Sequence, residues 1–161
     1  MEYIYIGKIV NTHGIKGEVR ILSRFDFKEK VFVPNTLIYI GEEKIEEKIV
    51  SYRKHKSFDM VLLGGINDIN DVLKYKGKNV YISSSSLKLS DNEILDEDLI
   101  GFTALYENKE IGIVNDIMDY GNKVLKINES LIPYNENFIL KLDKENKKIY
   151  LKNVEGLIKW K

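Results

Sequence analysis

Residues 7–22, GKIVNTHGIKGEVRIL, constrain the fold of this chain more than any other stretch. β-Branched residues occupy both ends of this stretch at mostly alternating positions, a pattern that suits a half-buried sheet. Between the flanks, residues 11–17 are mostly polar, and Gly14 and Gly17 can adopt positive φ at little steric cost. The stretch therefore predicts a β-hairpin with a polar, glycine-containing turn.

The predicted turn and the strand after it offer hydrogen-bond donors and cations, including His13, Lys16 and Arg20. Such groups suit a phosphate-rich surface, because positioned donors lose little entropy when they engage phosphates. A solvated turn that is polar for purely local reasons is the alternative. A Walker-type nucleotide loop is excluded, because the spacing Gly14-x-x-Gly17 lacks a Gly-Lys-Ser/Thr ending and a following helix.

Composition favours strands over helices along the whole chain. Ten tyrosines accompany many isoleucines and valines, whereas alanine, the best helix former, occurs only at Ala104. The 161 residues, 43% of them hydrophobic, can build one ordinary domain or two small ones. We therefore predict an all-β protein with one or two short helices.

Missing residue types and segments narrow the classes of function. Cysteine is absent, which excludes disulfides, thiolate metal sites and a cysteine nucleophile. Because no basic region followed by a long apolar run is present, we expect a cytoplasmic protein. His13 and His55 lack paired metal-ligand spacing, and no Gly-x-Ser-x-Gly signature occurs. We expect no metal, no cofactor and no catalysis; a small cofactor-binding barrel enzyme with His13 in its pocket is the alternative.

Charge is informative locally rather than in bulk. The 25 Lys and Arg residues equal the 25 Asp and Glu residues, so net charge does not indicate a nucleic-acid partner. However, Tyr52 and Phe58 bracket a basic tetrad of Arg53, Lys54, His55 and Lys56. Cations between aromatic residues can meet phosphates by charge and bases by stacking. A solvated loop tip between strands is the alternative.

A run of serines followed by an acidic segment predicts a boundary between two domains. We expect a first β-barrel domain over residues 1–86, an acidic linker over 87–97, and a second domain over 98–161. Within the first domain, apolar residues from Ile66 to Leu73 fit a short amphipathic helix that Asn67 could cap and that Gly77 ends. The second domain shows six short strands at regular spacing, typical of a small closed or half-open barrel.

Several ordered motifs resemble the ribosome maturation factor RimM family over nearly the whole chain. They are GKIVNTHGIKGEVRI near the start, SYRKHKSFDMVLLGGINDIND in the middle, and DEDLIGF, IGIVNDI and LIPYNENFILKLDKENKKIYL in the second half. The resemblance implies two β-barrel domains, the first similar to barrels of translation factors and the second a PRC-barrel. It also implies a bacterial factor that binds the head of the immature small (30S) ribosomal subunit and ribosomal protein nineteen, and assists 16S rRNA processing.

The resemblance also allows site residues to be assigned. By position, two loops of the family map onto this chain, and from their charge and expected exposure we assign RNA or ribosome contact to their residues. These are Asn11, His13, Gly14, Lys16, Gly17, Arg20, Arg53, Lys54, His55 and Lys56. Contact with the ribosomal protein falls to Ile94, Leu95, Asp98, Leu99 and Phe102. Two departures are visible: many members carry paired aromatic residues where this chain has Ile94 and Leu95, and Asn-Asp where it has Asn122 and Lys123. We expect a monomer; a PRC-barrel interaction module unrelated to ribosomes is the alternative.

Overall fold

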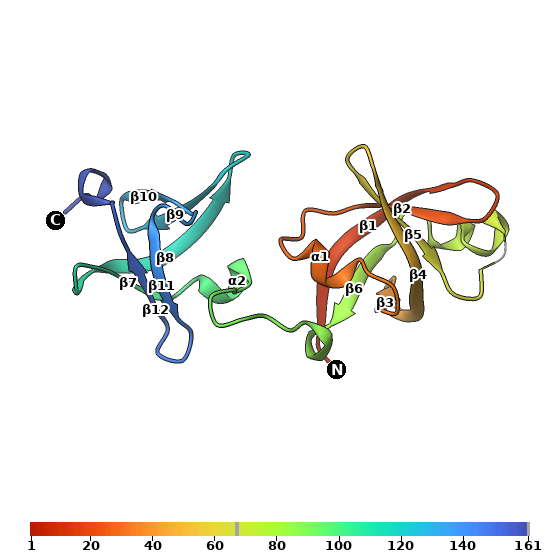
Figure 1. The fold of residues 1–161 in the computed structure, drawn as a ribbon, viewed down its shortest axis with the longest axis horizontal. Helices are drawn as coiled ribbons and strands as arrows, with labels where there is room; N and C mark the ends of the chain where they lie inside the picture. Colours follow the sequence, from red (N-terminus) through yellow and green to blue (C-terminus); the bar gives the residue numbers. More distant parts are fainter. Residues whose placement is uncertain (67, 161) are drawn as a thin grey trace. The chain divides into compact units, whose positions relative to one another are not determined.

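The computed structural model describes residues 1–66 and 68–160 and divides the chain into two compact units. The first comprises Met1–Lys88 and the second Leu89–Lys161. Both consist mainly of β-strands, which confirms the all-β prediction (Figure 1). No helix in the described residues is long and apolar enough to span a membrane.

The first unit is a closed six-stranded barrel. Its strands are β1 (Tyr3–His13), β2 (Glu18–Leu22), β3 (Leu37–Ile40), β4 (Ile45–His55), β5 (Phe58–Leu63) and β6 (Asn79–Ser83). They are ordered β1-β2-β5-β4-β3-β6, and β6 returns to pair with β1, Tyr3 lying opposite Ser83. β1 and β2 form the predicted hairpin. Closure leaves this barrel without an unpaired strand edge.

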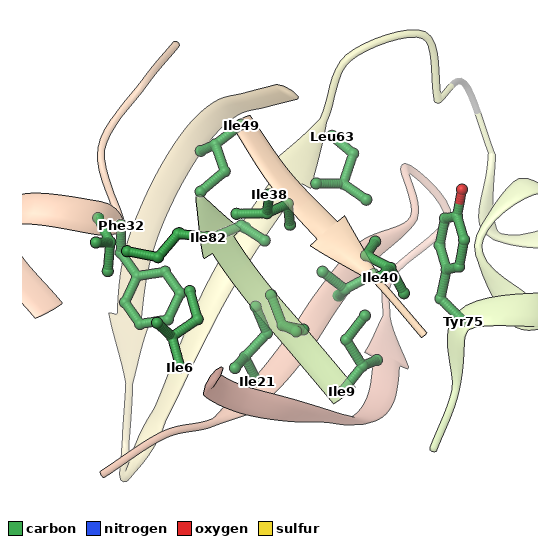
Figure 2. Close-up of a cluster of buried hydrophobic side chains, with 14 of the residues drawn as sticks. Ile6, Ile9, Ile21, Phe32, Ile38, Ile40, Ile49, Leu63, Tyr75 and Ile82 are labelled. Carbon is green, nitrogen blue, oxygen red and sulfur yellow. The ribbon is translucent and has the colours of Figure 1, made fainter. Parts of the chain in front are cut away.

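The barrel interior is filled by aliphatic side chains from all six strands (Figure 2). Where a strand is regular, inward and outward residues alternate along it. In β2, for example, Val19 and Ile21 are fully buried between more exposed neighbours. The outward positions of the same strands are consequently available for polar groups.

Short helical elements connect the strands of the first unit. They are α1 (Lys28–Val31), η1 (Ile69–Asp71), η2 (Leu73–Tyr75) and η3 (Ser84–Ser86). The region before Gly77 was predicted to form one short amphipathic helix, but it forms the two 3-10 helices η1 and η2 instead. The side chain of Asp68 accepts a hydrogen bond from the backbone N–H of Asn70 at 2.7 Å and so favours a tight turn. The predicted cap Asn67 lies outside the described residues.

The second unit is an open six-stranded sheet that curves into a half-barrel. After α2 (Asp96–Leu99) it contains β7 (Thr103–Tyr106), β8 (Lys109–Asp119), β9 (Lys123–Ile127), β10 (Ser130–Pro133), β11 (Ile139–Asp143), β12 (Lys148–Leu151) and η4 (Glu155–Leu157). The order is β10-β9-β8-β7-β12-β11, with only β12 and β7 parallel among the described strand pairs. β10 and β11 therefore form its edges.

The acidic segment before α2 packs against the second unit. Ile94 is buried in the hydrophobic core of that unit. The Nζ of Lys144 donates hydrogen bonds to the backbone carbonyls of Ser90 and Glu93, both at 2.8 Å. From Leu89 onward, this segment is thus held by side-chain contacts with the sheet that follows it.

Candidate nucleic-acid interface

The two turns predicted to bind RNA lie at opposite ends of neighbouring strands. β2 runs antiparallel to β5, with Val19 beside Val61 and Ile21 beside Asp59. The turn at residues 14–17 precedes β2, and the turn at residues 56–57 precedes β5. These turns therefore project beyond opposite ends of the β2–β5 pair (Figure 1). A surface shared by the two segments must be built from the strands between them.

Outward side chains of these strands do meet. Four of them, His13, Arg20, Arg53 and His55, form a group that we call the basic face. Nη2 of Arg20 lies 3.4 Å from Nδ1 of His13. The rings of His13 and His55 lie 6.1 Å apart between centroids. The first predicted segment and the basic tetrad are therefore brought together on the outer surface of one barrel.

Glu18 and Phe58 contact the basic face but were not predicted as site residues. The Arg53 guanidinium spans β5 and donates two hydrogen bonds to the Glu18 carboxylate, at 2.8 and 3.0 Å. The Arg20 guanidinium lies over the Phe58 ring, 5.1 Å from its centroid, a favourable cation–π contact. Strand register, rather than any local motif, brings Glu18 and Phe58 into this group.

Irregularities in the strands help to aim these side chains. The β1–β2 register shifts between Ile9 and Asn11, and the β4–β5 register shifts between Ile49 and Ser51. A β-bulge bends its strand and increases the local twist. Both shifts precede the strand segments that carry the basic face.

A shallow cleft of about 490 Å³ adjoins the basic face. Its lining includes His13, Lys16, Glu18 and Arg53. The cleft thus links the first predicted turn with the tetrad on β4. An extended polyanion could follow this cleft and meet cations from both segments.

Other predicted contact residues have mainly local structural roles. The Asn11 side chain accepts a hydrogen bond from the Thr12 backbone N–H at 2.9 Å. Gly14 adopts a φ of +74° in open space. Gly17 adopts +83°, and a Cβ there would lie 2.8 Å from the Asp68 carbonyl oxygen. Gly17 is therefore required both for its conformation and for this close approach.

The remaining tetrad residues diverge from the basic face. Lys54 alternates with Arg53 along β4, so its side chain leaves the opposite side of the strand. Lys56 occupies the following turn with a φ of +58°. Both are exposed. They extend the positive surface around the β4–β5 turn without joining the central group.

Charges on this surface shift one another's titration. The hydrogen bonds from Arg53, aided by the positive charge of its guanidinium, hold the pKa of Glu18 below its ordinary value. Partial burial lowers the pKa of His55, and the neighbouring charges of Arg53, Lys56 and Arg20 lower it further. Both causes favour the neutral form of the His55 imidazole.

In the second unit, most of the predicted contact residues are buried rather than exposed. Ile94, Leu99 and Phe102 are 8%, 0% and 4% exposed and belong to the hydrophobic core. Leu99 therefore offers no surface to a partner, whereas Ile94 and Phe102 line a surface cleft that Leu95 and Asp98 also line. Direct contact of Ile94 and Phe102 with a partner protein stays a prediction. Leu95 is half-buried, and Asp98 is exposed. Both line a shallow cleft with Lys144 and Lys147.

Metal ligands are not grouped in the described part of the chain. There, no three His, Cys, Asp or Glu side chains are arranged to hold a metal ion. The chemical groups that do converge are cations, imidazoles and one carboxylate, which suit reversible binding of an anion.

Both parts of the chain match known protein domains. Residues 4–87 match the RimM N-terminal domain, and residues 96–157 match the RimM PRC barrel domain. Ribosome maturation factor RimM of Geobacillus kaustophilus is 40% identical over 165 residues, covering 95% of this chain and 94% of the relative. Ribosome maturation factor RimM of Staphylococcus haemolyticus is 40% identical over 164 residues, covering 96% and 98% respectively.

A solved structure, the N-terminal domain of RimM from Thermus thermophilus, is 19% identical with a TM-score of 0.48. The match covers 55% of this chain and 98% of the chain in that structure. The two domain matches together span most of the sequence, and the relatives match from end to end. This chain belongs to the ribosome maturation factor RimM family.

Proposed function

We propose that this protein is a cytoplasmic, non-catalytic assembly factor for the small ribosomal subunit. In this proposal it binds the head of the immature subunit, contacts ribosomal protein nineteen and assists 16S rRNA processing. The observation that carries the RNA part is the convergence of His13, Arg20, Arg53 and His55 on one barrel surface. The relatives' name, ribosome maturation factor, supports the ribosomal target.

The basic face would bind the RNA backbone. Arginine presents a planar set of donors that matches phosphate oxygens, so Arg20 and Arg53 are the principal contacts. Glu18 occupies the Arg53 guanidinium in the free protein. A phosphate must therefore compete with this carboxylate, which favours sites where several phosphates meet the surface together.

Contact with the ribosomal protein would use the exposed rim around α2. Leu95 supplies a half-buried apolar surface, and Asp98 and Lys147 supply charges beside it. Apolar groups surrounded by polar ones are typical of protein interfaces. Ile94 and Phe102 line the same cleft and would add to this contact, whereas Leu99 would support the rim from within the core.

Assistance without catalysis requires only differential affinity. A factor that binds one arrangement of the subunit head more tightly than others shifts the population toward that arrangement. A chain that contacts both RNA and a ribosomal protein can be selective in this way. It binds most tightly only when the RNA and the protein are both placed so that it can contact them at once. RNA processing would then proceed on the favoured arrangement.

Co-sedimentation with ribosomal particles tests the proposal. We expect the protein to sediment with immature small subunits and not with mature ribosomes. The double variant Arg20→Ala with Arg53→Ala should lose most of this association. Lys74→Ala with Lys76→Ala, exposed cations elsewhere on the same unit, serves as the matched control. Equal sedimentation with mature ribosomes, or with no ribosomal particle, would contradict the proposal and favour a general interaction module.

A further inference from the structure

A second surface of the barrel is built from aromatic rings. Four tyrosines, Tyr3, Tyr5, Tyr39 and Tyr81, lie on the adjacent strands β1, β6 and β3, and we call them the tyrosine face. Strand register places Tyr81 between Tyr5 and Tyr39. The Tyr3 ring lies 5.2 Å from the Tyr39 ring and 6.4 Å from the Tyr81 ring. Tyr3 and Tyr5 remain 38% and 54% exposed.

A cation from the chain itself lies over these rings. Lys44, in the turn between β3 and β4, places its Nζ 4.3 Å from the Tyr81 ring centroid and 5.4 Å from that of Tyr3. An ammonium over aromatic faces is held by the negative potential of the rings. The tyrosine face is therefore shaped to accept a cation.

Carboxylates surround the tyrosine face. Glu42 and Glu43 are exposed in the same turn, and Glu46 accepts a hydrogen bond from the Tyr39 hydroxyl at 3.3 Å. A cleft of about 280 Å³ joins Tyr81 to Glu42 and Glu43, and Lys78 adds a cation to its lining. These acids repel phosphate and attract cations, so the tyrosine face differs in charge from the basic face.

We propose that the tyrosine face binds a lysine- or arginine-rich segment of a partner protein. One cation of that segment would take the place of Lys44 over Tyr3 and Tyr81, and others would pair with Glu42 and Glu43. Because the barrel is closed, a partner cannot add a strand to it. Binding must therefore use outward side chains, of which exposed tyrosines are well suited to interfaces.

Titration of the full chain with a labelled oligo-arginine peptide tests this site. We expect Tyr3→Leu with Tyr81→Leu to weaken peptide binding about fivefold, because the cation–π contacts are lost. Tyr120→Leu, which removes an exposed ring of the second unit, should leave binding unchanged. Equal binding by the double variant and the wild type would overturn the proposal.

Lys44→Gln supplies a test that does not depend on the packing of the rings. Removing the competing ammonium should strengthen peptide binding about threefold, and Glu42→Gln with Glu43→Gln should weaken it. If Lys44→Gln instead weakens binding of an oligouridylate and leaves the peptide unaffected, the face binds RNA and the proposal is wrong. Arg20→Ala with Arg53→Ala should retain peptide binding, so failure here is distinct from failure of the proposed RNA contact.

Discussion

The two units carry their candidate contact residues in different relation to their cores. In the closed barrel, core and basic face use alternate residues of the same strands, as Val19 and Arg20 illustrate. In the open sheet, Ile94 and Phe102 belong to the hydrophobic core and also line the cleft beside α2. The comparison predicts that substitutions of contact residues can separate binding from stability in the first unit, whereas in the second unit they would change both.

Truncation of a buried residue in the second unit should give the largest effect. We expect Leu99→Ala to lower the free energy of unfolding by about 3 kcal/mol, because it leaves a cavity around a fully buried side chain. Chemical denaturation followed by circular dichroism measures the loss. Leu95→Ala, in the same segment but half-buried, is the control. If both variants lost equal stability, Leu95 would have to be reassigned to the core.

Removing the guanidinium groups of the basic face should affect binding far more than stability. Arg20→Ala with Arg53→Ala is expected to weaken binding of a single-stranded RNA at least tenfold. The slope of log affinity against log salt should fall by about 1.4, for two phosphate contacts. Fluorescence anisotropy at several salt concentrations measures both quantities.

The same variant should change the free energy of unfolding by less than about 2 kcal/mol, because an exposed ion pair and a surface cation–π contact each contribute about 1 kcal/mol or less. A loss of several kcal/mol would show that the barrel also couples its surface to its core. Our separation of binding from stability in the first unit would then be wrong.

Neutralising Glu18 should strengthen RNA binding. Its carboxylate holds Arg53 through two hydrogen bonds, so Glu18→Gln frees the guanidinium for phosphate and should raise affinity about threefold. The same titration measures this, with Glu29→Gln as a control for loss of an exposed acid. Weaker binding would instead assign Glu18 the role of orienting Arg53.

Acidification should have the smallest effect. Burial and nearby cations lower the pKa of His55 in the free protein, whereas a bound phosphate favours the imidazolium and raises it. RNA affinity should therefore increase about twofold as pH falls from 8 to 6. Lowering a histidine pKa in the folded state also means that protonation of His55 opposes folding as pH falls. His55→Gln should flatten the dependence of affinity on pH; an unaltered profile would place the titrating group elsewhere.

Local patterns predicted much of this fold. Alternation of apolar residues around Gly14 and Gly17 identified the first hairpin, and the scarcity of alanine identified the all-β class. One continuous helix was predicted after Ile66 because Ile69 and Val72 are three residues apart, a spacing that fits a 3-10 turn as well as an α-helix. Short apolar repeats do not distinguish the two.

The candidate site could be predicted only as separate segments. His13 and His55 lie far apart in the sequence, and their proximity depends on pairing across β2 and β5 and on the register shifts in β1 and β4. Glu18 was hidden for the same reason, because its partner Arg53 comes from a distant strand. Burial of Leu99 likewise depends on how its segment folds back onto the second sheet.

The return of β6 to β1 joins the beginning and the end of the first barrel. With Tyr3 opposite Ser83, the polypeptide enters and leaves this unit at neighbouring points. Units of this kind are readily inserted into other proteins or circularly permuted, because a short connection can bridge their ends. We therefore expect that the barrel can be inserted into a loop of another protein, because its two ends lie together and its strand pairing would stay intact.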